Sequence, residues 1–305
     1  MQQLRTINKQ GTWFKGNLHN HTNLSDGELS PQELIQQYKN EGYSFISITD
    51  HWIYGTHQQF QNENFLIFGG VEFDIPITND DKRTYHIVAI GNPQTTAFPH
   101  GHTFSEISRS SNINGLINFL NDNEQICVLG HPCWSQIQTE ELDRIEKCLG
   151  VEIFNNGTFQ EFDKGFSETY YDRMLWTGKR ALCFGCDDTH PQTNLFGGFI
   201  QVKSESLSYA SILNSILSGS FYASNGPSIF DFYIEDNKVY VECSNCSLIS
   251  IHGKKFKGKA LYSAKNDLNF ASFKIGENMD YVYAICQDAQ GHKAWTQPIW
   301  LKSVD

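Results

Sequence analysis

Apolar and polar positions follow two different periods along the chain. Over the first two thirds, short apolar runs alternate with segments whose apolar residues recur at helical spacing. We expect buried strands at 45–49, 65–73, 85–90, 126–129, 151–154, 181–184 and 199–202. Helical patterns fall near 105–122, 139–147, 163–177 and 207–218. This alternation is typical of an α/β fold with mainly parallel strands, and it favours a barrel.

The clearest helix start lies at Ser30-Pro31-Gln32-Glu33. Serine is a good N-cap, proline suits the first turn, and the glutamate can close a capping box. Leu34, Ile35 and Tyr38 follow at i, i+1 and i+4, so we expect these three side chains to form the buried face of the helix.

From residue 226 onward the period changes to that of short strands. Candidates lie at 230–235, 238–244, 247–252, 258–263, 270–275, 281–287 and 292–300, separated by turn signals such as Glu235-Asp236-Asn237. Seven strands at this spacing suggest a small all-β sandwich. The change of pattern at Gly226-Pro227 therefore predicts two domains, 1–225 and 226–305.

Composition narrows the class of protein. The chain has 305 residues, with 23 basic and 34 acidic side chains and a net charge of −11, so a nucleic-acid polymer is a disfavoured partner. Aromatic residues at 13% and charged residues at only 19% argue against disorder. No signal peptide or membrane-spanning run is evident, and the eight cysteines fit free thiols in a reducing compartment. We therefore expect a cytoplasmic protein; the oligomeric state is left open.

The histidines carry most of the chemical information. Eleven are present, and chance would give fewer than one His-x-His pair, yet the chain has two, His19-x-His21 and His100-x-His102. The first pair follows an aromatic stretch, and residues i and i+2 of a strand share a face, so both imidazoles can bind one cation. A polar loop with incidental histidines is the alternative for this pair. A surface loop is favoured over a substrate lid for the second pair.

Further metal-ligand types come at the ends of, or within, successive predicted strands. They are Asp50, His51, Glu72, His86, His131, Asp188 and His190. A single histidine in such a place is more often a satisfied core residue, but that explanation is poor for six successive segments. In α/β barrels the active site is built at this edge of the strands.

The ordered set resembles the motifs of the PHP (polymerase and histidinol phosphatase) family of metal-dependent phosphoesterases. The resemblance spans about residues 10–225 and rests on His19-x-His21 with Asp26, Asp50-His51, Gly70-x-Glu72, His86, His131-Pro132 and Asp188-x-His190. The tail is similar to a branch with a C-terminal β-sandwich, on the segments 224–227 and 294–300. That branch includes carbamate-ester hydrolases.

The resemblance implies a distorted (β/α)7 barrel that holds two or three divalent ions. It implies a first metal held by His19, His21, Glu72 and Asp188, a second by Glu72, His86 and His131, and a third by Asp26, His51 and His190. Asp187 competes with Asp188, which is chosen by its spacing to His190. Glu72, His190 and Asp50 are the expected catalytic residues. Zn, Mn or Fe all suit the mixed ligand set.

The expected net charge of the metal pocket favours an anionic substrate. Six neutral imidazoles and three carboxylates carry −3, against +6 for three divalent ions, which leaves the pocket at +3. We expect a phosphoesterase that cleaves a small phosphomonoester or nucleotide with a hydroxide bridging two metals. The alternatives are hydrolysis of a carboxyl or carbamate ester at the same metals, and a non-catalytic binding barrel.

Other residues are candidates for lesser roles. His57, His102 and Asn155 are candidates for substrate contacts at the mouth of the site. The two Cys-x-x-Cys pairs, Cys183/Cys186 and Cys243/Cys246, lie too far apart for a zinc ribbon and are read as packed thiols.

Overall fold

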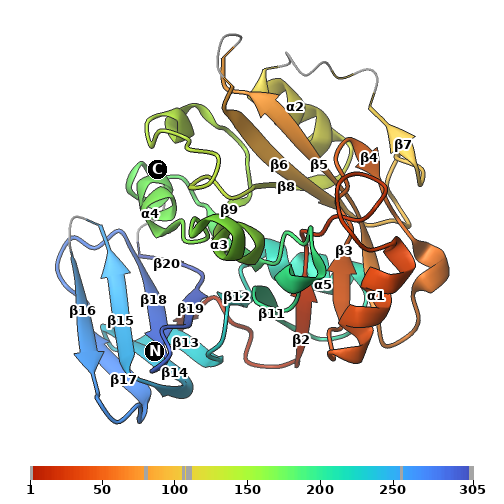
Figure 1. Cartoon of the computed structure of the whole chain (residues 1–305). Coiled ribbons are helices and arrows are strands. Elements are labelled where there is room, and N and C mark those ends of the chain that lie inside the picture. The colour runs from red at the N-terminus through yellow and green to blue at the C-terminus, as the bar shows by residue number, and fades with distance from the viewer. Residues whose placement is uncertain (1–2, 79–81, 105–106, 108–111, 255–256, 302–305) are drawn as a thin grey trace.

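A long mixed sheet organises the first three quarters of the computed structural model, which describes residues 3–78, 82–104, 107, 112–254 and 257–301 (Figure 1). Its strands run in the order β10-β9-β8-β6-β5-β3-β2-β11-β12. Their bounds are β2 (Thr12–Asn17), β3 (Phe45–Ser47), β5 (Leu66–Pro76), β6 (Thr84–Gly91), β8 (Gln125–Leu129), β9 (Gly150–Asn155), β10 (Leu182–Cys186), β11 (Phe199–Ser204) and β12 (Phe221–Ser224). The α/β fold class predicted from the sequence is confirmed.

The expectation of mainly parallel strands is correct for two groups of three strands. It is wrong for β6, which lies between the groups, and for β11, which pairs antiparallel with both β2 and β12. Strands β2, β3 and β5 are parallel, as are β8, β9 and β10, but β6 is antiparallel to both β5 and β8. The reason is the short connection from Pro76 to Thr84. A parallel crossover needs a dozen or more residues, so this connection can only close a hairpin.

The two ends of this curled sheet meet at β10 and β11. A Cβ atom on Gly198 would lie 2.1 Å from the carbonyl oxygen of Cys186, and one on Gly185 would lie 2.8 Å from that of Phe199. No backbone ladder joins these two strands within the described residues. Glycine on both sides of the seam lets the strands approach, and the expected barrel stays a prediction.

In the described residues, five α-helices and three 3₁₀ turns connect the strands. They are α1 (Pro31–Asn40), α2 (Ile113–Asp122), α3 (Asn156–Phe162), α4 (Glu168–Trp176), α5 (Tyr209–Leu217), η1 (Gln58–Phe60), η2 (Glu141–Arg144) and η3 (Gln192–Asn194). Helix α2 packs on β8, α4 on β9 and α5 on β11 (Figure 1). The predicted start of α1 is confirmed, since Ser30 and Glu33 form the capping box and Leu34, Ile35 and Tyr38 are buried. None of the helices in the described ranges is long and apolar enough to cross a bilayer.

Two helix predictions need correction. The pattern at 139–147 forms only the short 3₁₀ turn η2. The segment 163–177 is helical only from Glu168, because the unforeseen helix α3 ends at Asp163 in a left-handed conformation, φ 54°. Residues 105, 106 and 108–111 of the predicted helix 105–122 lie outside the described residues, and α2 begins after its N-cap Asn112.

The tail consists of two antiparallel layers around one core. The first layer has the order β1 (Leu4–Arg5), β13 (Ile229–Glu235), β14 (Lys238–Cys246) and β17 (Leu268–Lys274), and the second contains β15 (Leu248–Gly253), β16 (Lys257–Tyr262), β18 (Tyr281–Gln287), β19 (Lys293–Thr296) and β20 (Ile299–Trp300). Phe232, Val241, Ile249 and Val282 are buried between them. The predicted strand 292–300 is divided into β19 and β20. A remaining two-stranded sheet pairs β4 (Ile53–Tyr54) with β7 (His102–Thr103).

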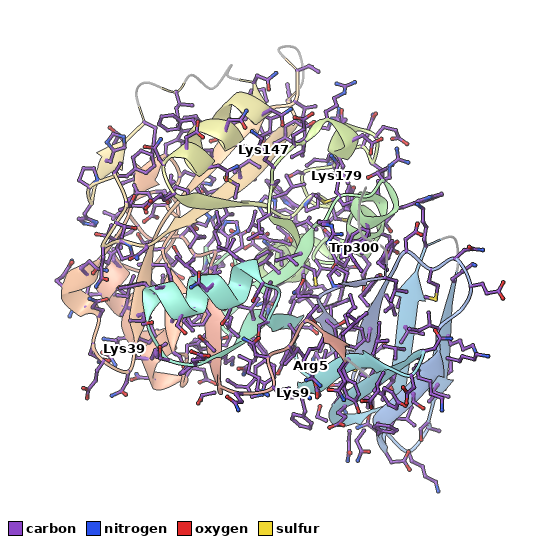
Figure 2. The ribbon with its side chains drawn as sticks, turned by 180° about the vertical axis from the view of Figure 1, so that it is seen from behind. Arg5, Lys9, Lys39, Lys147, Lys179 and Trp300 are labelled. Carbon is purple, nitrogen blue, oxygen red and sulfur yellow. The ribbon has the colours of Figure 1, made fainter. Side chains whose placement is uncertain are left out.

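The N-terminal segment crosses to the tail. Strand β1 pairs with β13, with Arg5 opposite Tyr233, and Arg5 also lies 3.0 Å from the carboxylate of Asp231. Figure 2 shows this segment from behind, with Arg5 and Lys9 labelled. The N-terminal strand therefore shares one layer with β13, β14 and β17 of the tail, although the sequence analysis placed them in different domains.

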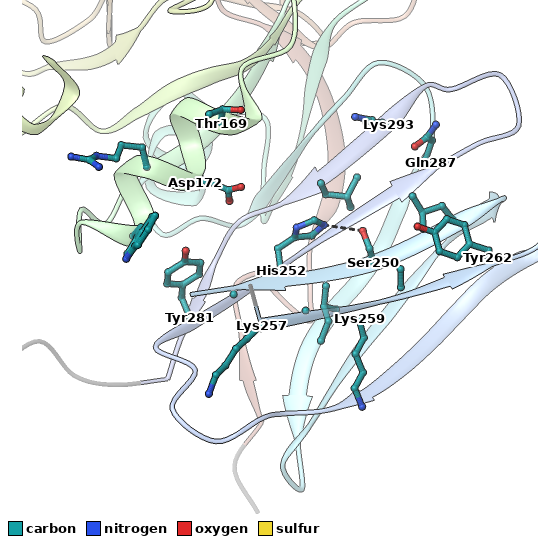
Figure 3. Close-up of a pocket in the computed structure, with 18 of the residues that line it drawn as sticks. Thr169, Asp172, Ser250, His252, Lys257, Lys259, Tyr262, Tyr281, Gln287 and Lys293 are labelled. Carbon is teal, nitrogen blue, oxygen red and sulfur yellow. Dashed lines mark hydrogen bonds between the residues drawn. The ribbon is translucent and has the colours of Figure 1, made fainter. Parts of the chain in front are cut away.

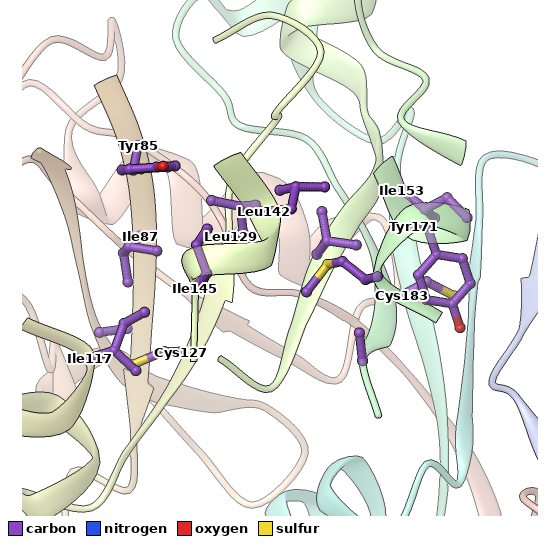
Figure 4. Packing of buried hydrophobic residues seen from close by; sticks show 14 of the residues in the cluster. Tyr85, Ile87, Ile117, Cys127, Leu129, Leu142, Ile145, Ile153, Tyr171 and Cys183 are labelled. Atoms are coloured by element: carbon purple, nitrogen blue, oxygen red, sulfur yellow. The ribbon is translucent and has the colours of Figure 1, made fainter. Parts of the chain in front are cut away.

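Tail and curled sheet are joined by direct pairing and by a common core. Strand β19 pairs with β12, so the long sheet continues into the tail. Trp295 is fully buried and stacks near Phe154, and the Gln297 side chain donates to the Cys183 carbonyl (2.8 Å) and accepts from its N–H (2.9 Å). The same apolar cluster includes Tyr171 and Cys183 beside the helices of the first part (Figure 4). The boundary at 225/226 stays a prediction.

Replacing Gln297 by alanine should destabilise the whole chain. The change leaves the buried N–H and carbonyl of Cys183 without partners, which costs about 2 kcal/mol or more. Urea unfolding followed by fluorescence measures the loss, and we expect one cooperative transition. Gln290→Ala, at an exposed turn, is the control. Two separate transitions, with only one shifted, would show that the tail folds by itself.

Candidate metal centre

All nine predicted ligands gather at one edge of the long sheet, and we call them the ligand cluster. The residues come from β5 and β6 or from the segments that follow β2, β3, β8 and β10: His19, His21, Asp26, His51, Glu72, His86, His131, Asp188 and His190. Glu72 is central, because its carboxylate lies 2.9–3.4 Å from ring nitrogens of five histidines.

The first group is fully buried. Nε2 of His19 and Nε2 of His21 are only 3.1 Å apart, and both face Oε2 of Glu72 at 3.2 and 3.0 Å. Oδ1 of Asp188 lies 3.1 and 3.2 Å from the same two nitrogens. The four ligand atoms lie within 4.8 Å of one another, as donors to a single cation would.

The second group shares Glu72. Nδ1 of His86 lies 2.9 Å and Nε2 of His131 lies 3.3 Å from its other oxygen, Oε1. The two carboxylate oxygens therefore face different sets of histidines. A bridging carboxylate between two cations needs this division.

The third group is partly open to solvent. Oδ2 of Asp26 lies 3.4 Å from Nε2 of His190 and 3.6 Å from Nε2 of His51, and the Asp26 side chain is 51% exposed. Burial would raise the pKa of Asp26, but the hydrogen bond from His190 and the nearby His21 lower it below its usual range. This open side gives a ligand its approach to the cluster.

The electrostatics of the cluster fit bound cations. Burial alone would lower the pKa of His21, yet Asp188 and Glu72 outweigh burial and raise it to about 10. Burial would raise the pKa of Glu72, but His19, His86 and His51 hold it well below its usual range. Oδ1 of Asp188 is buried and accepts no hydrogen bond from the described residues, although two imidazoles face it. A field that draws protons onto histidines also draws metal ions, and mixed N/O donors suit Zn²⁺, Mn²⁺ or Fe²⁺.

Two ligands are held in strained backbone conformations. His131 has φ 21° and Asp188 has φ 51°, both uncommon for residues other than glycine. The N–H of Asp188 donates to the His19 carbonyl (2.9 Å), and the N–H of His131 donates to the carboxylate of Glu152 (2.9 Å). Such strain persists where surrounding bonds fix the residue, as is common at functional sites.

Glu152 is a site residue that the sequence reasoning missed. It is buried on β9, and its carboxylate lies 2.6 Å from Nδ1 of His19 while it also accepts from Nδ2 of Asn155 (2.9 Å). Asn155 donates to Asp188 as well (3.1 Å). Because the second nitrogen of a metal-binding histidine is usually fixed by a carboxylate, Glu152 orients His19. A single charged residue inside the apolar run 151–154 was the available signal.

The structure distinguishes the neighbouring aspartates. Asp187 turns away from the cluster and accepts hydrogen bonds from Tyr38 (2.6 Å) and from the N–H groups of Phe196 and Gly198. Burial raises its pKa to about 6. Of the pair, Asp188 is therefore the residue that faces His19 and His21.

Asp50 lies beside the cluster in an anchoring position. Its buried carboxylate accepts from the N–H and hydroxyl of Thr22 and from the hydroxyl of Ser25, each at 2.7 Å. These bonds fix the loop between His21 and Asp26. This geometry supports an anchoring role for Asp50, and its expected role as an acid stays a prediction.

The expected substrate contacts lie in different places. Asn155 is at the cluster, where its amide nitrogen is occupied by Glu152 and Asp188. His57 is buried against His100, with ring centroids 4.7 Å apart, and burial lowers its pKa to about 4. His102 packs on Phe104 at 4.6 Å. The second His-x-His pair thus belongs to a separate aromatic group near β4 and β7.

Comparison with known proteins agrees with this arrangement. Residues 17–131 match the family model described as PHP domain. The segment 17–131 is therefore similar to the PHP domain, the family that the ordered motifs indicated. The likeness to the carbamate-ester branch is not confirmed.

One solved structure shares the fold at low sequence identity, and two others align over part of the chain. A two-domain protein from Bacteroides vulgatus containing a predicted PHP-like metal-dependent phosphoesterase aligns with a TM-score of 0.50 and 14% identity, over 96% of this chain and 98% of that chain. A protein from Bifidobacterium adolescentis assigned as a metal-dependent phosphoesterase gives a TM-score of 0.42 and 15% identity, over 59% and 89% of the two chains. An amidohydrolase from Chromobacterium violaceum gives 0.39 and 17%, over 58% and 88%. No curated protein matches the chain.

Replacing Glu152 by glutamine should weaken metal binding without unfolding the protein. The amide keeps the size but turns one acceptor into a donor, which loses a bond to His19, His131 or Asn155. We expect metal affinity to fall about 10–100-fold, as for other residues that orient a ligand. Titration against a competing chelator measures it, with Glu161→Gln on the exposed face of α3 as control. Unchanged affinity in Glu152→Gln would contradict the orienting role.

Proposed function

We propose that the chain is a metal-dependent phosphoesterase that hydrolyses a small phosphomonoester or a nucleotide. The observation that carries the proposal is the convergence of nine ligand-type residues around the buried carboxylate of Glu72. The three ligand carboxylates and six neutral imidazoles carry −3, and Glu152 behind His19 adds −1, so three divalent ions leave the centre positive. An anionic phosphate balances that charge better than a neutral ester does.

The residues of the cluster would hold the ions in the three groups described. Bound divalent ions supply Lewis acidity toward phosphoryl oxygens and lower the pKa of water. Glu72 sets the spacing of two of the ions because each of its oxygens faces a different group. Glu152 and Asn155 keep His19 and Asp188 in position. His190, on the open side beside Asp26, would hold the third ion where three ions bind; where only two bind, its Nε2 is placed to move a proton to or from a substrate.

One aromatic side chain shields this centre. The Trp134 ring stands edge-on to His131 and His86, with centroids 5.1 and 5.7 Å away, and lies 6.0 Å from Phe162, which is 54% exposed. Such a wall excludes water from one side of the cluster. It also offers an apolar contact to the organic part of a phosphate ester.

The function is tested most directly at Glu72. Glu72→Gln removes the central charge while keeping the size, so we expect the kcat for p-nitrophenyl phosphate to fall more than about 100-fold and bound metal to drop. Elemental analysis of the unmodified chain should give two or three divalent ions. His102→Ala is the matched control, since His102 packs against Phe104 outside the cluster. Near-normal turnover in Glu72→Gln with loss in His102→Ala would place the real site elsewhere.

A second experiment separates the phosphoesterase from its alternatives. If the substrate is a phosphate ester, inorganic phosphate should inhibit competitively and p-nitrophenyl acetate should be a poor substrate. Faster turnover of the acetate, with no phosphate inhibition, would favour the carboxyl- or carbamate-ester hydrolase. A metal-loaded chain inactive on both esters would favour the non-catalytic binding barrel.

A further inference from the structure

A cavity of about 880 Å³ opens between α4 and the second layer of the tail and extends to the edge strand β16 (Figure 3). Ligand sites are common where two parts of a chain pack together, and their usual volume is about 300–1,000 Å³. The residues that line the cavity do not include any member of the ligand cluster. The cavity is therefore a candidate site separate from the metal centre.

Strand register decides which side chains of the tail face α4. The hydroxyl of Tyr283 on β18 donates to the carboxylate of Asp172 on α4 (2.7 Å), so Tyr283 points toward the helix. His252 lies opposite Tyr283 in the antiparallel pair of β15 with β18, and such opposite side chains share a face. Ser250 is two residues from His252 on the same strand and faces the helix as well.

Strand β16 contributes only small residues to the part of this face beside His252, namely Gly258 and Ala260. Lys259 lies opposite Ile251, so Lys259 and Lys257 point to the other face of the sheet. Figure 3 shows the two lysines directed away from His252. The hollow between helix and sheet is therefore open above β16 and receives no cation from it.

The two cations that line the cavity on the helix side are already paired. Arg173 pairs with Asp143, and Lys293 pairs with Glu168 at 2.7 Å. Within the described chain no cation pairs with Asp172, and burial raises its pKa. An anion therefore finds no unpaired positive partner here. A cation finds only a carboxylate whose charged form is disfavoured by burial, so the cavity suits an uncharged ligand.

Hydrogen-bonding groups line the middle of the cavity. Ser250 Oγ and His252 Nε2 lie 2.9 Å apart, and burial lowers the pKa of His252, so its ring is neutral. Only one oxygen of Asp172 accepts a hydrogen bond from the described residues. The side chains of Thr169 and Gln287 make no hydrogen bond within the described ranges. A purely apolar ligand would leave these donors and acceptors unpaired, which is costly.

Aromatic rings border the polar groups. Trp176 lies one turn beyond Asp172 on the same side of α4 and is 50% exposed. Tyr262 is 78% exposed and lies four residues beyond Gly258 on β16, about 13 Å along the strand. Asp172 and Tyr262 stand on different sides of the cavity (Figure 3). A ligand that contacts both must therefore be elongated.

We infer that this cavity is a second ligand site, which binds a short neutral saccharide. A sugar has a rim of hydroxyl groups that both donate and accept hydrogen bonds, and its C–H faces pack on aromatic rings. Asp172 and the Ser250–His252 pair bond the hydroxyls, whereas Trp176 and Tyr262 contact the ring faces. The site does not depend on the proposed hydrolase reaction.

The probes are glucose, galactose, mannose, maltose and cellobiose, each titrated against the full metal-loaded chain by saturation-transfer NMR. We expect saturable binding of maltose or cellobiose that is tighter than the binding of glucose, because a disaccharide spans the cavity. Trp176→Ala and Asp172→Asn should each weaken this binding about tenfold, as loss of an aromatic contact or of a charged acceptor does. Absence of saturable binding by all five sugars would overturn the inference.

Matched controls separate a binding effect from a general one. Phe270→Ala removes a ring that is also 50% exposed, and Asp122→Asn neutralises a carboxylate on α2, so both should leave the affinity unchanged. Thermal unfolding should be unchanged in Asp172→Asn, because asparagine can still accept from Tyr283. Equal loss of affinity in test and control variants would contradict the site.

Two further measurements test the charge of the ligand and the place where it binds. Glucuronate and glucosamine keep the ring of glucose but add a negative or a positive charge, and we expect neither to bind better than glucose. The bound disaccharide should bind Glu72→Gln as it binds the unmodified chain. Tighter binding of a charged sugar, or loss confined to Glu72→Gln, would refute a neutral site in this cavity.

Discussion

The buried carboxylate of Glu72 sets the constraint on which the rest of the structure depends. Ring nitrogens of five histidines lie within 3.4 Å of its two oxygens, and the side chain is 1% exposed. A charge buried so deeply is costly unless it is paired. The strands must therefore place histidines from several distant segments around Glu72. Attraction between the carboxylates and the imidazoles, or bound cations, holds these side chains there.

A second set of buried carboxylates supports this centre without joining it. Glu152 orients His19, Asp50 ties down the loop between His21 and Asp26, and Asp187 accepts hydrogen bonds from Tyr38 and two backbone N–H groups. Each of these three carboxylates bonds groups outside the ligand cluster or the far side of a ligand. This division explains why two adjacent aspartates, 187 and 188, have opposite pKa shifts: burial dominates for Asp187, whereas histidines outweigh burial for Asp188.

The residues that gather around Glu72 could be named from the sequence because most of them follow or interrupt an apolar run, a local signal, and because their order resembles that of a known family. That they bind metal stays a prediction. The α/β class and the capping box of α1 were accessible from local signals as well. The antiparallel β6 could have been inferred from its short connection, but the run itself does not show direction. The orienting role of Glu152 could not be predicted, because it depends on which face of β9 packs against His19. The positions of His57 and His102 outside the cluster likewise depend on which neighbours their loops contact. Those are tertiary facts that no single segment contains.

The tail also contributes to the centre, although no tail residue touches a ligand in the described structure. Trp295 packs beside Phe154, and Phe154 precedes Asn155 on the strand that carries Glu152. Gln297 ties the tail to Cys183, on the strand that leads to Asp188. Phe154 and Cys183 are fully buried. Without the tail, β9 and β10 would expose apolar surface. Because strands packed on both faces owe their register to both neighbours, the two strands would also lose their fixed positions. These strands carry or precede Glu152, Asn155 and Asp188, which hold or orient the cluster. The two parts recognised in the sequence thus act as one support for a single metal centre.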